Sequence, residues 1–161
     1  MSSSFRRSPI FDLRDWWMSN PRLKEIFKID QRGFAPFFPV QQQPESEVPY
    51  VVYDFKRITK REAWFYQADV LYMEINVIDF QDGYEIIGIM IDMANKGAIS
   101  ARDLSHWLRS ENKRQDFELH SITFEGAGEA EPSSEQGGEI KISALFTIEY
   151  SPLQGNYIKD F

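Results

Sequence analysis

The segment 140–150 alternates between apolar and polar side chains, and this alternation constrains the fold more than any other feature of the chain. Its apolar positions are Ile140, Ile142, Ala144, Phe146, Ile148 and Tyr150. The polar positions between them are Lys141, Ser143, Thr147 and Glu149. Because successive side chains of a β-strand point to opposite faces of a sheet, the sequence predicts a strand with one face on the core and the other in water. Such strands are typical of antiparallel sheets.

Other segments predict three more strands and four helices. Runs of β-branched and aromatic residues indicate strands at about 50–55, 63–78 and 117–124. Apolar residues spaced three and four apart indicate helices at about 9–17, 23–27, 84–95 and 100–108, with Ser100 expected to cap the last. This order is typical of the α+β class. We expect a mostly antiparallel (mixed) four-stranded sheet flanked by helices that lie against one face.

The strand at 63–78 changes its pattern midway. Trp64, Tyr66, Val70 and Tyr72 lie on one parity. Leu71, Met73, Ile75 and Val77 lie on the other. A regular strand keeps its apolar residues on one face. Either a β-bulge shifts the register near residues 68–69, or both faces are covered there.

The length of 161 residues favours a single domain over the whole chain, 1–161. We expect N-terminal helices at 1–29, a Pro- and Phe-rich extended segment at 30–48, an α+β core at 49–150 and a C-terminal tail at 151–161. Phe34, Phe37 and Phe38 lie in the irregular segment. An irregular segment of this length is typically functional or disordered, so we expect these rings to dock, either on their own domain or on a neighbour.

Composition excludes several classes of function. The chain has no cysteine, which excludes disulfide scaffolds, thiol nucleophiles and Cys-based zinc sites. Its formal net charge of −7 argues against a DNA-coating role, because phosphate binding requires a concentrated basic surface. No apolar run approaches the roughly 20 residues of a membrane helix, and no secretory signal is visible. We therefore expect no membrane partner and no cofactor.

Two arrangements of carboxylates leave an enzymatic alternative open. Glu139 and Lys141 have the Glu-x-Lys spacing of a common nuclease core, and Glu125 could supply the second acid that holds a metal. Asp79, Asp82 and Glu85 lie where a strand is expected to meet a helix. They could bind a divalent cation, but acids there more often complement the helix dipole. We expect no catalytic or metal-binding residue.

His106 and His120 are the two histidines of the chain, and neither has a partner at ligand or triad spacing. A catalytic base must lie within hydrogen-bond reach of its target. We therefore interpret both as structural or surface side chains.

Two charged segments favour an interaction role. A basic hairpin tip is expected at 56–62, with Lys56, Arg57, Lys60 and Arg61. An acidic, solvated hairpin loop is expected at 125–139, including Glu129, Glu131 and Glu135. In a ring, the basic segment of one subunit and the acidic segment of the next would be complementary.

Several segments together resemble the tail terminator proteins of tailed bacteriophages, which in contractile tails are called tail completion and sheath stabilizer proteins. The resemblance rests on Pro49-Tyr50-Val51-Val52-Tyr53-Asp54, on the aromatic strand from Trp64 to Val77, on Ile86-Ile87 in the following helix and on Leu145-Phe146-Thr147-Ile148-Glu149-Tyr150. The break Asn20-Pro21-Arg22-Leu23 is similar to the start of the same proteins. The resemblance to this family covers roughly residues 10 to 150.

The resemblance implies a non-enzymatic virion protein of the tail or neck, assembled in the host cytoplasm. Members form a homohexameric ring with a mixed sheet flanked by helices. The ring caps the head-proximal end of the tail tube, ends tube and sheath polymerisation and offers a surface to neck or connector proteins. The partners implied are therefore other copies of the chain, the tube protein, the sheath protein of contractile tails and the neck. The net charge adds that DNA would pass the lumen without specific binding.

The expected contact surfaces follow from these features. They comprise Phe34, Phe37, Phe38, Lys56, Arg57, Lys60, Arg61, Glu129, Glu131 and Glu135. A head–tail connector or stopper protein of the neck is the alternative within the same class. A metal-dependent nuclease using Glu125, Glu139 and Lys141 is the alternative from another class.

Overall fold

The computed structural model describes residues 9–27, 29, 35–39, 49–60, 67–128, 131–132 and 139–152. The helices are α1 (Pro9–Trp17), α2 (Pro21–Phe27), α3 (Phe80–Ala94) and α4 (Ala98–Ser110). The strands are β1 (Phe37–Pro39), β2 (Tyr50–Lys60), β3 (Gln67–Val77), β4 (Phe117–Ala127), β5 (Glu131–Pro132) and β6 (Ile140–Pro152).

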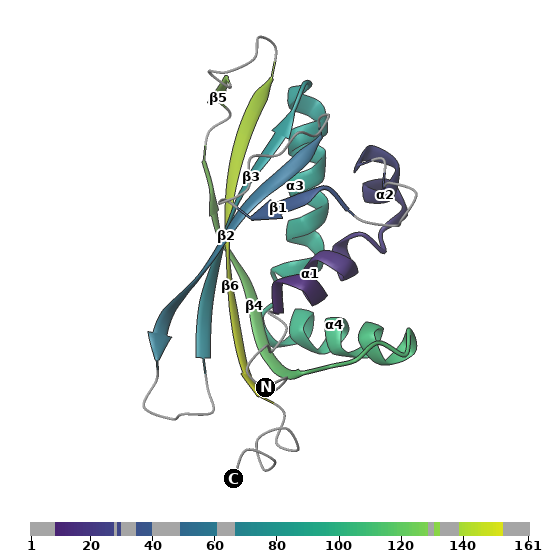
Figure 1. The fold of residues 1–161 in the computed structure, drawn as a ribbon, viewed down its shortest axis with the longest axis vertical. Coiled ribbons are helices and arrows are strands. Elements are labelled where there is room, and N and C mark those ends of the chain that lie inside the picture. The colour runs from purple at the N-terminus through teal and green to yellow at the C-terminus, as the bar shows by residue number, and fades with distance from the viewer. Residues whose placement is uncertain are drawn as a thin grey trace.

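A single mixed sheet forms one layer and the helices form the other. Its strand order is β1-β2-β3-β6-β4, with the short β5 paired to β6. β1 is parallel to β2, and the other pairs are antiparallel. All four helices lie on the same side of the sheet (Figure 1). The predicted α+β class is confirmed, whereas the expected number of four strands is wrong because β1 and β5 also pair into the sheet.

β1 lies in the segment that was expected to be irregular. The backbone N–H of Val51 donates to the carbonyl of Pro36 at 2.9 Å, and Phe37, Phe38 and Pro39 then pair with β2. Proline lacks a backbone donor and is tolerated on edge strands. β1 is such an edge. The prolines that obscured this strand in the sequence are therefore compatible with it.

Both explanations of the pattern change in the predicted strand 63–78 find support near residues 68–69. Arg57 pairs with Asp69 and Thr59 pairs with Ala68, so β2 holds one extra residue there, while β3 keeps an unbroken register with β6. Ala68 and Asp69 are neighbours that point to opposite faces, and both are buried. Trp64 and Tyr66 lie outside the described residues. β2 also continues to Lys60. Lys56, Arg57 and Lys60 therefore lie within a strand rather than in a turn at 56–62.

The core lies between the sheet and the helices. The alternating apolar side chains of β6 from Ile142 to Tyr150 are buried, as predicted. The ring of Trp17 packs edge-on against Phe146 with centroids 5.2 Å apart, and its indole N–H donates to the carbonyl of Met90 at 3.2 Å. Buried indole N–H groups require such a partner. This contact fixes α1 against both β6 and α3.

The start of α3 differs from the expected start at residue 84. Asp79 is the N-cap and accepts the backbone N–H of Gln81 at 2.9 Å, so the helix begins at Phe80. Gly83 lies inside the helix and is buried. A Cβ at this position would lie 2.4 Å from Ile142 Cδ1 and 3.1 Å from Val77 Cγ2. The glycine therefore allows α3 to approach the sheet closely.

Ser100 is not the cap of α4, because that helix begins at Ala98. Its hydroxyl donates to the carbonyl of Met93 at 2.8 Å and accepts the N–H of Lys96 at 2.9 Å. Gly97 then exchanges two backbone hydrogen bonds with Ile122 of β4. The connection between α3 and α4 thus covers part of the free edge of β4, which protects it from pairing with another strand.

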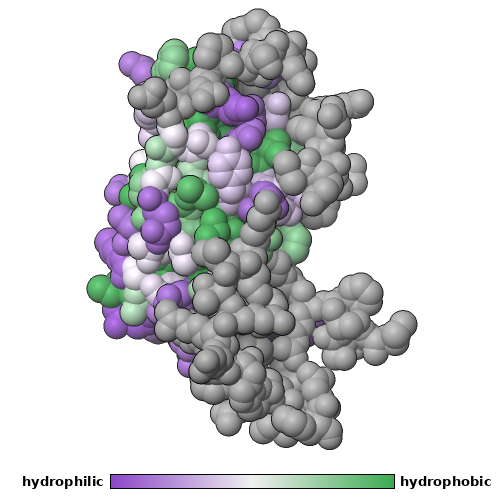
Figure 2. Space-filling view, turned by 90° about the vertical axis from the view of Figure 1, so that its left-hand side faces the viewer, coloured by the Kyte–Doolittle hydropathy of each residue, from purple (hydrophilic) through white to green (hydrophobic). Residues whose placement is uncertain are grey.

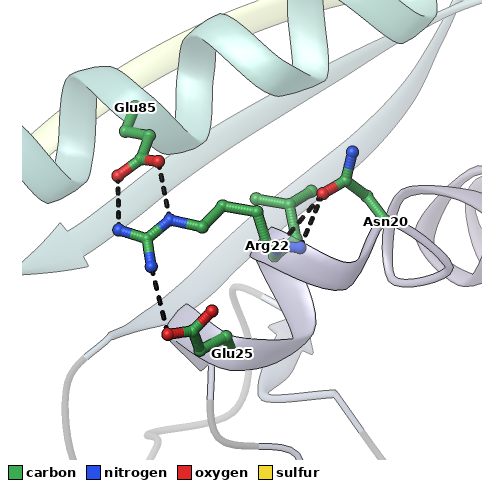
Figure 3. A network of polar contacts seen from close by, with 5 residues as sticks. Asn20, Arg22, Glu25 and Glu85 are labelled. Atoms are coloured by element: carbon green, nitrogen blue, oxygen red, sulfur yellow. Dashed lines mark hydrogen bonds and ion pairs between the residues drawn. The ribbon is translucent and has the colours of Figure 1, made fainter.

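The N-terminal helices are fastened to α3 by a polar network (Figure 3). Asn20 caps α2, accepting the N–H of Arg22 at 2.9 Å, and Pro21 occupies the first helical position. The guanidinium of Arg22 holds both carboxylate oxygens of Glu85 at 2.7 and 2.9 Å and also contacts Glu25 at 3.4 Å. The hydrogen bond from Arg22 lowers the pKa of Glu85.

Candidate interaction surface

The two charged segments lie at opposite ends of the same three strands. At one end Lys60 of β2 pairs with Gln67 of β3, which in turn pairs with Tyr150. At the other end Val77 of β3 pairs with Ile140, directly after the acidic segment. β3 has 11 residues, and the two ends are therefore roughly 33 Å apart at the usual rise of a strand.

The basic end is formed by the last part of β2. Lys56, Arg57 and Lys60 belong to this strand, while Arg61 lies outside the described residues. At the acidic end, Glu131 belongs to β5 and pairs with Lys141 of β6. Glu129 and Glu135 lie outside the described residues. Their contacts with a partner remain predictions.

The three phenylalanines of the extended segment have different positions. Phe37 is buried and its ring packs near that of Phe27, with centroids 6.0 Å apart. It docks on its own domain, and its place among the expected contacts with a neighbour is corrected for this reason. Phe38 points to the other face of the sheet, half-buried and edge-on to Tyr50 at 6.3 Å. Phe34 lies outside the described residues.

The three residues of the nuclease alternative, Glu125, Glu139 and Lys141, do not lie together around one site. Glu125 lies where β4 pairs with Leu145 and Phe146, about 20 Å along β6 from Glu139. Lys141 pairs instead with Glu74 of β3, with Nζ and Oε2 3.6 Å apart. A metal site requires its acids within reach of one ion. The arrangement of these three side chains therefore contradicts that alternative.

The other candidate ligands have structural partners. Asp79 caps α3 and Glu85 pairs with Arg22. His120 shares a hydrogen bond with Ser151 at 2.8 Å, and His106 is exposed on α4. Within the described part of the chain, no group of three or more His, Asp or Glu side chains could hold a metal ion.

A groove of about 490 Å³ lies beside α1 and the end of α4. Arg14, Asp15, Trp107 and Lys113 contribute to its lining. Arg14 pairs with Asp15 at 3.0 Å, and the ammonium of Lys113 lies 5.5 Å from the centre of the Trp107 ring. These charges are thus already engaged within the molecule.

The face of the sheet opposite the helices carries exposed side chains of described residues. Tyr72 of β3 and Leu145 of β6 are direct cross-strand partners on this face, and each is 37% exposed. The Glu74–Lys141 ion pair lies beside them. Among the described residues, Figure 2 shows on this face a mixture of hydrophobic residues in green, residues of intermediate hydropathy in white and hydrophilic residues in purple. The face combines apolar contact area with polar groups, as protein interfaces commonly do.

A second exposed apolar surface was not found from the sequence. Ile78, Phe80 and Tyr84, here called the apolar corner, lie where β3 passes into α3 and are 65%, 49% and 57% exposed. The rings of Phe80 and Tyr84 stack on each other with centroids 6.4 Å apart. The spacing gave no signal of this exposure, since Tyr84 and Phe80 lie three and seven positions before the buried Ile87 and so share its helix face by spacing alone.

The helices of the described residues are too short or too polar to span a bilayer. No family model matches the chain, and no curated protein matches it. A solved structure titled "Virion of native gene transfer agent (GTA) particle" contains a chain with this fold, at 12% identity and a TM-score of 0.50. The match covers 86% of this chain and 91% of that chain. At this identity the likeness establishes a shared fold.

Proposed function

We propose that this protein is a structural component of a phage-like virion that forms a ring on the head-proximal end of the tail tube. The supporting observation is the fold shared with a chain of a gene transfer agent particle over most of both chains. The resemblance to tail terminator proteins favours the same role. In this role the protein ends tube polymerisation, and that of a sheath where one is present, and presents a surface to the neck.

The positions of the charged segments support a ring. A cyclic assembly needs two different surfaces on each subunit, so that one subunit binds the next by rotation. The proposed surfaces are the basic segment at the end of β2 and the acidic segment before β6, whose adjoining strand residues are separated along β3. Opposite charges on them would orient the subunits head to tail.

Capping a tube requires a surface that binds the last tube ring and a surface that refuses further tube subunits. The sheet face opposite the helices, with Tyr72 and Leu145, is a candidate for the first of these contacts. The net charge of −7 supports a lumen through which DNA passes without binding. The partners proposed are the tube protein, the sheath protein in a contractile tail, and neck proteins.

A connector or stopper protein of the neck is a second candidate, because the match to a virion particle fits it equally well. The two roles differ in where the protein lies. A terminator binds the tube end and limits tail length, whereas a stopper binds the head side and retains DNA.

The decisive experiment is electron microscopy of particles made without this protein. The terminator role predicts tails of irregular or excessive length that are not joined to heads. Tails of uniform length beside heads that have lost their DNA would favour the stopper. Tails of normal length joined to full heads would exclude both roles.

A further inference from the structure

We propose that the apolar corner of one copy of this chain docks on the start of α4 of the next copy. The receiving surface, here called the basic patch, consists of Lys96, Ile99 and Arg102. The inference rests on the proposed function, because it names the contact by which the proposed ring would close. The residues of the corner and of the patch are not among the contact residues expected from the sequence.

The apolar corner exposes an unusual share of the large hydrophobic side chains. Six such residues are exposed in the described part of the chain, and three of them form this corner within seven positions. Two of the three, Phe80 and Tyr84, stack their rings on each other. Clustered apolar and aromatic side chains mark protein contacts, while isolated ones need no explanation. The corner therefore indicates a protein partner.

The carboxylates beside the corner specify the charge of that partner. Asp79 and Asp82 are both exposed. The segment 78–85 contains one further acid, Glu85, and no Lys or Arg. Glu85 is paired with Arg22, so the two aspartates set the charge beside the rings. A surface with an apolar centre and an acidic rim is complementary to one that combines apolar and basic side chains.

The start of α4 is a surface of this kind, and the structure describes all of it. Ile99 is 49% exposed, and Lys96 and Arg102 are exposed as well. The backbone N–H of Ile99 donates to the carbonyl of Lys96 at 3.1 Å, and Arg102 follows Ile99 by three positions, so the three side chains are neighbours. The segment 95–102 contains no acid. Within the described part of the chain, neither cation pairs with a carboxylate.

The corner and the basic patch lie at opposite ends of α3. In Figure 1 this helix runs from the end of β3 down to α4. It has 15 residues, so the two surfaces are roughly 22 Å apart at the usual rise of an α-helix. The corner can therefore contact the patch only on another copy. Each copy offers one surface of each kind, and a contact between unlike surfaces that repeats by rotation closes a ring.

Two symmetric contacts between copies are disfavoured by charge. A contact of two corners would place Asp79 and Asp82 against the same carboxylates of the other copy, and like charges in apposition oppose binding. A side-by-side pair of antiparallel α3 helices would join unlike ends. It would also bury Gln81 and Asp92, which are exposed along the helix, and burial of an unpaired charge is costly. The end-to-end contact leaves these polar side chains in water.

The first test uses the absence of cysteine from the chain, which makes introduced thiols the only ones present. In a glutathione redox buffer, the double variant Ile78→Cys/Ile99→Cys should form disulfide-linked oligomers up to the size of the whole ring on a non-reducing gel. The matched control is Ile78→Cys/His106→Cys. His106 is exposed on the same helix, but about 10 Å beyond Ile99 and out of reach of a disulfide at the contact.

The pattern of linked oligomers identifies the contact. Linked dimers alone would show a two-fold pair of copies and overturn the proposal. Equal oligomers in the control would overturn it as well. If the purified chain is monomeric, the variants are tested in purified particles that contain them, where the same linked oligomers should form.

The second test exchanges the charges. Asp82→Lys and Lys96→Glu should each weaken ring assembly at least about tenfold, because each places like charges in apposition. The two substitutions in one chain should restore assembly, measured by native mass spectrometry over a dilution series. Asp92→Lys is the control, since Asp92 is exposed on α3 outside both surfaces. A combined variant that assembles no better than the single ones would contradict the pairing of these surfaces.

Failure of the contact and failure of the proposed function are distinguishable. Rings or capped tails that form no disulfide in the double variant would refute the contact and leave the proposed function standing. A protein that neither assembles nor occurs in tails would refute the proposed function, and the contact with it.

Discussion

At the scale of single residues, Gly83 connects the sequence most directly to the fold. It lies where α3 crosses the sheet, and the space beside its Cα is filled by Ile142 and Val77. Any side chain there would push the helix away from β6. Gly88 lies in the same helix, but nothing is within 4 Å of the position of its Cβ. Substitutions at these two glycines therefore distinguish the effect of core packing on stability from the effect of helix propensity.

Gly88→Ala should raise the free energy of unfolding by up to about 1 kcal/mol, because alanine is the better helix former. Gly83→Ala gains the same propensity but overpacks the core, which typically costs about 1–3 kcal/mol. Urea denaturation should therefore find Gly83→Ala less stable than Gly88→Ala by about 1–3 kcal/mol. Equal stabilities would show that α3 does not approach the sheet as described.

The ion pair between Arg22 and Glu85 makes a prediction about pH. Because Arg22 lowers the pKa of Glu85 in the folded protein, this pair stabilises the fold above the ordinary glutamate pKa of about 4.3. Its contribution is lost as the pH falls through the lowered value. An NMR titration should find the pKa of Glu85 below the ordinary range in the wild type and close to it in Arg22→Met.

Glu25→Gln is the control for this titration. Glu25 contacts Arg22 at 3.4 Å, but the two shorter hydrogen bonds to Glu85 do not involve it. The pKa of Glu85 should stay low in this variant. An ordinary pKa for Glu85 in the wild type would contradict the network.

At the scale of elements, the periodic segments could be predicted and the irregular ones could not. The alternation from Ile140 to Tyr150 and the apolar stripe of α3 each have one interpretation, because burial on one face imposes the period. β1 had no such signal. It is three residues long, ends at Pro39 and is held by pairing with a strand more than ten positions away. Residues 37–39 alone therefore give no sign that they pair with β2.

The start of α4 illustrates the same limit. Ser100 followed by Asp103 has the pattern of a capping box, but the hydroxyl of Ser100 bonds to two backbone groups of the preceding turn. The helix begins two residues earlier, at Ala98, because the bridge between Gly97 and Ile122 positions the chain. A tertiary contact here overrides the local signal.

Removing this hydroxyl leaves the partly buried N–H of Lys96 and carbonyl of Met93 without this partner. Ser100→Ala should therefore lower the free energy of unfolding by about 1–3 kcal/mol. Ser110→Ala is the control, since its hydroxyl bonds to the carbonyl of Trp107 at an exposed helix end and should change stability by less than about 0.5 kcal/mol. Thermal unfolding followed by circular dichroism measures both. Equal losses of stability in the two variants would contradict the proposal that the Ser100 hydroxyl holds the connection between α3 and α4.

The candidate surfaces were predictable in part for a related reason. Charged segments are visible in the sequence itself, but the contacts of the basic and acidic segments with a partner stay predictions. Exposed apolar residues are not visible in this way, because Phe80 and Tyr84 look like core residues until the position of α3 is known. Phe37 has the converse history, since it was expected at a surface and is buried.

At the scale of the whole molecule, the strand residues next to the basic and the acidic sequence segments lie at opposite ends of β3. If these ends join neighbouring copies, assembly must depend on salt, because exposed charges are screened over about 8 Å at physiological ionic strength and about 3 Å at 1 M. Raising the salt concentration from about 0.05 M to about 1 M shortens this screening length to about 3 Å. The rings should therefore dissociate at the higher salt concentration in sedimentation experiments. Rings that tighten with salt would indicate a purely apolar contact.

The central claim is that this chain closes a ring on the end of a tail tube. Cryo-electron microscopy of intact particles, with the protein located by a label fused to its C-terminus, measures this directly. The account predicts a ring of six copies between the last tube ring and the neck. Density for the protein elsewhere in the particle, or single copies without neighbours at the tube end, would contradict it.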